Sequence, residues 1–242
     1  MASSATGQLA IRLRRFHEEA CADGELTAVV EELNRTQGQK EGGRIFACWA
    51  HSGSEKTVVF LELFSDASDA SFNDDVSLGH FFTHPASEEI LVPPSLRSLQ
   101  QPASSLFLSG EGVSYQSPHL EIEDWSRVLY VVATSRVHDG CLAPLMQLEE
   151  QYYKKLEEEE TRKNVFYRWH LSSDLQIQKV AELYRDFEGF ATHMRVCHDL
   201  FVAAEPFRTC LSVEIFGDSE TLRKMERWGL PIRKFCTRTL HP

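Results

Sequence analysis

The sequence repeats one phrase 120 positions apart. Residues 58–66, VVFLELFSD, return as residues 178–186, QKVAELYRD. The same offset superposes three aromatic pairs, which are Phe46 with Phe166, Trp49 with Trp169, and Phe81 with Phe201. A match that extends over several elements indicates a diverged tandem repeat, with halves at residues 1–117 and 118–242. Two copies are too few for a solenoid, but two small α+β units can pair as the subunits of a symmetric dimer do.

The second half carries strand and helix signals in a definite order. A β-branched, apolar run predicts a strand over 128–134, and apolar residues at helical spacing predict a helix over 142–160. Turn-forming residues between two further runs predict a hairpin of strands. Asp186 stands where the N-cap of the next helix belongs. The remaining predicted elements are strands at 165–171, 176–184, 209–216 and 232–237, and helices at 187–203 and 219–228.

The first half follows the same plan as far as residue 84. Its predicted strands cover 9–16, 45–51, 57–64 and 105–109, and its predicted helices cover 26–33 and 69–82. Between residues 84 and 105 the chain is rich in proline and serine, with Pro93 and Pro94 adjacent. This composition predicts a surface loop, or a short helix flanked by loop.

The order strand, helix, strand, strand, helix, strand in each half is the ferredoxin-like plan, an α+β fold. A sheet of this kind packs one face on its two helices and leaves the other face bare. Two such sheets that face each other remove both bare faces from water, which gives a physical reason for fusing two copies. We therefore predict tandem ferredoxin-like (βαββαβ) repeats that form an intramolecular dimeric α/β barrel.

Composition narrows the classes of partner. The net charge of −11 argues against a nucleic-acid-binding or membrane-binding protein, since both need clustered cations. No run approaches the roughly 20 apolar residues of a membrane span. The six cysteines form no CxxC pair, which favours reduced thiols in a cytoplasmic protein. Residues 1–17 faintly resemble a transit peptide, but we interpret Leu9 to Phe16 as a strand because the aligned segment at 129–136 is internal.

Residues 182–201 read ELYRDFEGFATHMRVCHDLF. This segment resembles the strand-to-helix segment of antibiotic-biosynthesis-monooxygenase-type domains, in the dimeric α/β-barrel superfamily. The resemblance implies a pocket between the sheet and the second helix of one repeat, in a family with cofactor-independent oxygenases of quinols and polyketide phenols. It also includes haem-degrading enzymes, but the first strands here lack the asparagine that those branches use. The first half has Asn73 opposite His193 and Leu78 opposite His198, so the resemblance implies a site in the second half alone.

His193 is the best candidate for a catalytic base, because an imidazole can take a proton from a phenol before electron transfer to O₂. Alternation along the strand puts Arg168 and His170 on one sheet face and Tyr167 and Trp169 on the other. Core or inter-repeat packing is the favoured interpretation of Trp49 and Trp169. The predicted substrate-binding residues are Arg168, His170, Glu182, Tyr184 and His198, with a salt bridge to Arg168 as an equal alternative for Glu182.

Other motifs carry less chemistry. His193 and His198 point about 140° apart on a regular helix and do not face one ligand. The pairs His193/Cys197 and His80/His84 do share a helix face, but no third ligand is visible, so we favour structural roles and predict no metal site. No GxGxxG, GxSxG or GxxxxGK[ST] motif occurs.

Two function classes follow. The first is a monooxygenase without an organic cofactor that acts on a small aromatic or quinol-type molecule in the pocket of the second repeat. The second is a non-catalytic protein that binds a small ligand or a partner and retains the fold. Both expect a small-molecule partner or ligand, and both leave association into homo-oligomers open.

Overall fold

The computed structural model describes residues 10–17, 44–52, 57–64, 87–92, 106–116, 122, 124–159, 164–172, 174–225 and 232–238. The chain divides into two compact units. The first unit comprises Met1–Leu106 and Arg238–Pro242, and the second comprises Phe107–Thr237. None of the described helices is long and apolar enough to cross a membrane.

The second unit has a ferredoxin-like core. Its elements in chain order are β6 (Leu129–Val137), α3 (Leu142–Glu159), β7 (Asn164–Leu171), β8 (Ile177–Tyr184), α4 (Phe187–Val196), α5 (His198–Ala204) and β9 (Arg208–Gly217). The four strands are antiparallel neighbours in the order β9-β6-β8-β7. This order confirms the predicted α+β, ferredoxin-like fold for the unit.

Further elements extend this core. A short 3₁₀ helix, η3 (Trp125–Arg127), precedes β6, and α6 (Ser219–Met225) leads to β10 (Ile232–Arg238), which runs parallel to β9. Strand β5 (Leu106–Gln116) pairs antiparallel with β7. The sequence predicted only residues 105–109 of this strand and placed it in the first half. Its pairing with β7 places it in the sheet of the second unit.

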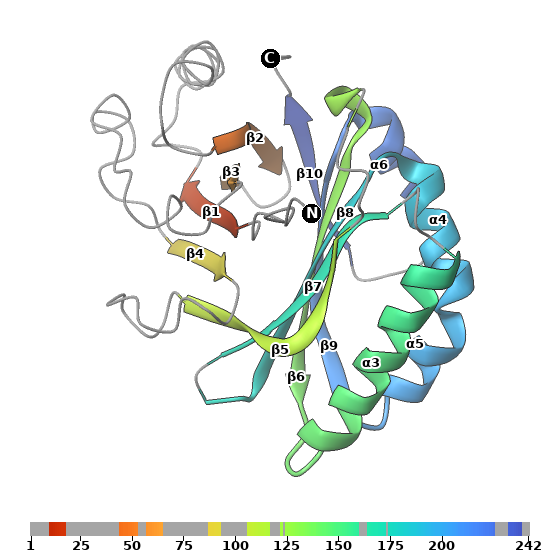
Figure 1. The fold of residues 1–242 in the computed structure, drawn as a ribbon. Coiled ribbons are helices and arrows are strands. Elements are labelled where there is room, and N and C mark those ends of the chain that lie inside the picture. The colour runs from red at the N-terminus through yellow and green to blue at the C-terminus, as the bar shows by residue number, and fades with distance from the viewer. Residues whose placement is uncertain are drawn as a thin grey trace, which may run out of the picture. The chain divides into compact units, whose positions relative to one another are not determined.

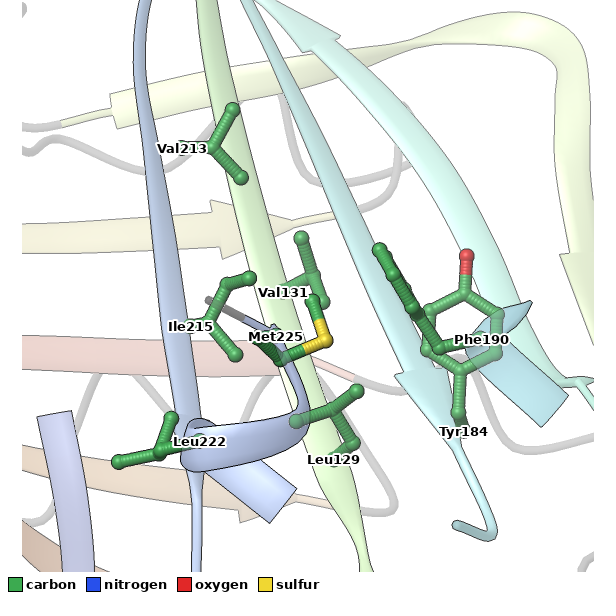
Figure 2. Packing of buried hydrophobic residues seen from close by; sticks show 8 residues of the cluster. All are labelled: Leu129, Val131, Tyr184, Phe190, Val213, Ile215, Leu222 and Met225. Carbon is green, nitrogen blue, oxygen red and sulfur yellow. The ribbon is translucent and has the colours of Figure 1, made fainter. Parts of the chain in front are cut away.

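The helices of the second unit lie together along one side of its sheet (Figure 1). Side chains that alternate along the strands pack against them, as Figure 2 shows for one cluster. That cluster consists of Leu129, Val131, Tyr184, Phe190, Val213, Ile215, Leu222 and Met225. Removing these apolar side chains from water holds α4 and α6 on the sheet.

The predicted helix over 187–203 is two helices. Asp186 caps α4 as predicted, since its carboxylate accepts a hydrogen bond from the Gly189 amide at 2.9 Å. Helix α4 ends at Val196, and α5 begins at His198. Cys197 between them has ψ near 5°, and its amide still donates to the carbonyl of His193 at 2.9 Å. Neither glycine nor proline marks the break, so the residue pattern did not predict it.

The first unit has four described strands: β1 (Ala10–His17), β2 (Arg44–Ser52), β3 (Thr57–Phe64) and β4 (Ser87–Val92). They are antiparallel neighbours in the order β4-β1-β3-β2, which matches β9-β6-β8-β7 in the second unit. The prediction of loop or short helix over 84–105 was wrong for β4, which pairs with β1. The predicted helices at 26–33 and 69–82 lie outside the described residues, and closure of the two units into a barrel stays a prediction.

A buried ionic cluster joins β1 to β3 in the first unit. Arg12 Nε and Arg14 Nη2 each donate to Glu62 Oε2 at 2.7 Å, and all three side chains are buried. The guanidinium groups also lie over aromatic rings, with Arg12 5.3 Å from the Phe64 centroid and Arg14 5.4 Å from the Phe60 centroid. Cation–π contact adds to the ionic attraction where water is excluded. The carboxylate therefore holds two buried cations together.

Replacing Glu62 tests how far the first unit depends on this cluster. Glu62→Ala leaves two guanidinium groups buried side by side and is expected to lower the free energy of unfolding by about 3–5 kcal/mol. Urea denaturation followed by circular dichroism measures the change. The triple variant Arg12→Met, Glu62→Leu, Arg14→Met removes every charge of the cluster and should recover most of the loss. A Glu62→Ala protein as stable as wild type would contradict this account.

Replacing Asp186 tests how much its N-cap contributes to the stability of the second unit. Asp186→Ala removes the acceptor of the Gly189 amide and is expected to cost about 1 kcal/mol of stability. Asp186→Asn keeps an acceptor oxygen and should lose much less. Urea denaturation of the two variants gives the comparison, and equal losses would mean that the charge of Asp186 matters more than its cap.

Candidate functional site

Polar groups lie among the buried apolar side chains between the helices and the sheet of the second unit. Four elements supply them: α3, β7, β8 and α4. Their polar side chains, all buried, are Glu149, Tyr167, Gln178, Glu182, Tyr184 and His193. Buried polar groups need partners inside the protein, so their arrangement determines what the region can do chemically.

His193 is completely buried on the inner side of α4. Three aromatic rings surround its imidazole, with centroid distances of 5.9 Å to Tyr167, 5.6 Å to Tyr184 and 5.5 Å to Phe201. These rings come from β7, β8 and α5. The imidazole therefore lies among aromatic faces and edges that would also suit a planar aromatic ligand.

Glu182 and Tyr184 lie two residues apart on β8, on the face toward the helices. The Tyr184 hydroxyl donates to Glu182 Oε2 at 2.5 Å, and the Tyr184 ring meets the Phe190 ring edge-on at 5.6 Å. Tyr184 thus contacts both the carboxylate and the His193 ring. The structure brings together three of the predicted site residues, Glu182, Tyr184 and His193.

Glu149 on α3 centres a network that the sequence interpretation missed. Its Oε2 accepts from the Tyr167 hydroxyl at 2.6 Å, and its Oε1 accepts from Gln178 Nε2 at 2.7 Å. Arg208 Nη1 lies 3.4 Å from Glu149 Oε1 and donates to Gln178 Oε1 at 2.8 Å. Burial and the neighbouring Glu149 carboxylate raise the pKa of Tyr167, so its hydroxyl stays protonated and donates. The network holds the Tyr167 ring against His193.

Arg168 and His170 lie on the opposite face of the sheet. Tyr167 and Trp169, which flank Arg168 on β7, pack with Tyr152 and Leu200 of the helices. Because side chains alternate along a strand, Arg168 and His170 point away from the helices. Their partners on β8, Ala181 and Lys179, likewise alternate with Glu182, which faces the helices. The structure does not bring Arg168 or His170 to His193, and it separates Arg168 from Glu182. Core packing is confirmed for Trp169, whereas the side chain of Trp49 lies outside the described residues.

His198 is exposed at the first position of α5 and does not join the buried group. The break at Cys197 separates it from the helix that carries His193. Cys197 itself is buried against the helices and the sheet. In the part of the chain that the structure describes, no three His, Cys, Asp or Glu side chains converge as they would around a metal ion. His80 and His84 lie outside that part.

No protein-family model and no curated protein matches the chain. Solved structures do match it. A "putative monooxygenase" from Fusobacterium nucleatum superposes with a TM-score of 0.59 at 11% identity, over 86% of this chain and 90% of that chain. A "putative monooxygenase" from Lactobacillus acidophilus superposes with a TM-score of 0.56 at 8% identity, over 86% and 91%. The chain therefore shares its fold with these two proteins. This confirms the resemblance at the level of fold.

A third match is a ferredoxin-fold protein from Listeria monocytogenes that is described as related to antibiotic biosynthesis monooxygenases. Its TM-score is 0.43 at 9% identity, over 86% of this chain and 93% of that chain.

His170, on the sheet face away from the helices, is expected to make the stability of the protein depend on pH. Burial, then the charge of Arg168, holds the pKa of His170 well below 6.5, so the folded protein keeps this ring neutral. The unfolded chain binds the proton more readily. The free energy of unfolding is therefore highest above the pKa that His170 has in the unfolded chain. It falls by about 1.4 kcal/mol for each pH unit below that pKa.

Urea denaturation at pH of about 7.5 and about 5.5, on either side of the ordinary histidine pKa, measures this loss. His170→Gln has no proton to gain and should show a smaller difference between the two pH values. His198→Gln, which changes an exposed ring, serves as the control. An unchanged pH dependence in His170→Gln would show that other groups cause the loss.

Proposed function

We propose that the second unit is a monooxygenase for a small aromatic or quinol-type substrate, with His193 as the catalytic base. The observation that carries the proposal is the buried His193 imidazole among the rings of Tyr167, Tyr184 and Phe201. The likeness in fold to proteins named as putative monooxygenases supports it. The proposed substrate lies between the sheet and helices α3 to α5, against these rings.

The first step is removal of a phenolic proton. His193 takes the proton from the substrate hydroxyl, which creates an imidazolium next to a phenolate. A buried site separates such charges at a cost unless fixed groups stabilise them. Glu182 supplies a negative charge near the imidazolium, and Tyr184 links the two because it bonds to Glu182 and contacts His193. In this proposal Glu182 and Tyr184 act as positioning residues.

The phenolate is then the reductant for O₂. Electron transfer from the phenolate, followed by carbon–oxygen bond formation, places one oxygen atom of O₂ on a ring carbon. Loss of the hydrogen from that carbon and loss of the phenolic hydrogen leave two carbonyl groups, and the second oxygen atom departs as water. The substrate supplies all four electrons, so the proposed reaction consumes phenol and O₂ and gives quinone and water without an organic cofactor.

Arg168, His170 and His198 have no place in this mechanism. The first two lie on the other sheet face, and His198 is exposed. The sequence interpretation assigned substrate contact to Arg168 and His170. In this proposal Tyr167 makes that contact instead. Its hydroxyl is held by Glu149, which fixes the ring plane beside His193.

Aerobic oxidation of a panel of phenols and hydroquinones tests the proposal. His193→Asn keeps the size of the side chain but has no basic nitrogen, and it is expected to lower kcat by about 100-fold or more. His198→Asn, five residues further on, should keep the wild-type rate because its ring is exposed. Oxygen uptake and quinone absorbance measure both variants. Equal rates for His193→Asn and wild type would remove His193 from the mechanism, and ligand binding without oxygen uptake would favour the non-catalytic alternative.

A further inference from the structure

Tyr152 on α3 has a completely buried side chain. Its hydroxyl has no hydrogen-bond partner among the residues that the structure describes. Two other buried tyrosines of this unit are different, because Tyr167 donates to Glu149 and Tyr184 donates to Glu182. A buried tyrosine hydroxyl normally finds a partner, so this one calls for an explanation.

Tyr152 shares its aromatic neighbours with His193. Its ring stacks on Tyr167 at 6.0 Å between centroids and lies 5.4 Å from the Phe201 centroid. The same two rings lie 5.9 and 5.5 Å from the His193 ring. The hydroxyl of Tyr152 and the imidazole of His193 are therefore polar groups around one pair of aromatic rings.

The surrounding polar groups do not use this hydroxyl. Glu149 lies one turn earlier on α3, but its oxygens already accept from Tyr167, Gln178 and Arg208. Burial raises the pKa of Tyr152 far above its usual value, which keeps the hydroxyl protonated and able to donate. It is a buried donor beside the proposed substrate position.

We propose that Tyr152 determines ligand specificity by donating a hydrogen bond to an oxygen of a small aromatic molecule that lies against Tyr167 and Phe201. The inference rests on the proposed function, because it assigns a contact for the same substrate. It goes further in naming the ligand chemistry, which is a planar ring that bears an uncharged acceptor oxygen, such as a ketone or phenol. The hydroxyl is buried, and burial disfavours a charged group more than a neutral one, so the position favours an uncharged oxygen over a carboxylate.

Two aromatic probes, one with the acceptor oxygen and one without it, test the hydrogen bond from Tyr152. The probes are 1-tetralone and tetralin, which share a carbon skeleton, and the full-length protein is titrated with each by calorimetry. Loss of one neutral hydrogen bond in Tyr152→Phe should weaken the binding of 1-tetralone about three- to tenfold and leave the affinity for tetralin unchanged. Tyr130→Phe is the matched control, because Tyr130 alternates with Leu129 and Val131 and so faces away from the helices.

Folding stability gives a second readout. Because the Tyr152 hydroxyl makes no internal hydrogen bond, Tyr152→Phe should not lower the urea midpoint of the unliganded protein. Tyr167→Phe, which breaks the bond to Glu149, should lower it. A ligand role predicts that Tyr152→Phe loses affinity without losing stability, which a purely structural role would not produce.

The outcomes separate this inference from the proposed reaction. Equal affinity of wild type and Tyr152→Phe for 1-tetralone, or no binding of 1-tetralone to wild type, overturns the role of Tyr152. Phenol oxidation with the same KM in Tyr152→Phe also overturns it and leaves the oxygenase proposal standing. Selective weakening of 1-tetralone in a protein that oxidises nothing supports the role of Tyr152 and overturns the oxygenase proposal.

Discussion

The burial of β3 and β8 on both faces is the constraint on which the rest of the structure depends. Seven of the eight residues of each strand, Val58–Phe64 and Gln178–Tyr184, are buried, so neither strand has a solvent-facing side. Every polar side chain on them must find its partners inside the protein. Each strand nevertheless carries a glutamate at the corresponding position, Glu62 and Glu182. The contacts of these two carboxylates distinguish the two units.

The neighbouring strands explain why the two carboxylates differ. Opposite Glu62, β1 presents Arg12, and opposite Glu182, β6 presents Val131. Two guanidinium groups bond to Glu62, whereas Glu182 accepts from the hydroxyl of Tyr184, a neutral donor that adds a hydrogen bond and no charge. The ionic cluster pairs the buried charges of Arg12, Arg14 and Glu62 in the first unit. In the second unit, the Tyr184 ring whose hydroxyl donates to the carboxylate also contacts the buried imidazole of His193.

Local signals predicted the strands well because β-branched, apolar runs and turn residues define them. The strands predicted at 57–64 and 165–171 appear as Thr57–Phe64 and Asn164–Leu171, and Asp186 caps its helix. Strand β4 was missed because the prolines that follow it, Pro93 and Pro94, suggested a loop. Its pairing with β1, which the local sequence does not reveal, determines its conformation. The break at Cys197 was missed for a similar reason, since the apolar spacing continues through it.

The site was harder to predict, because periodicity assigns side chains to faces but does not say which face meets the helices. Alternation correctly paired Arg168 with His170, and the bulk of Tyr167 and Trp169 then decided the direction, since large aromatic rings gain most from packing under α3 and α5. The informative signal was a polar residue in an apolar stripe. Glu149 falls at helical spacing between Leu145 and Tyr152, all three are buried, and a carboxylate at such a position requires donors from the sheet. Buried polar exceptions of this kind, more than the spacing of the histidines, indicate where this unit can do chemistry.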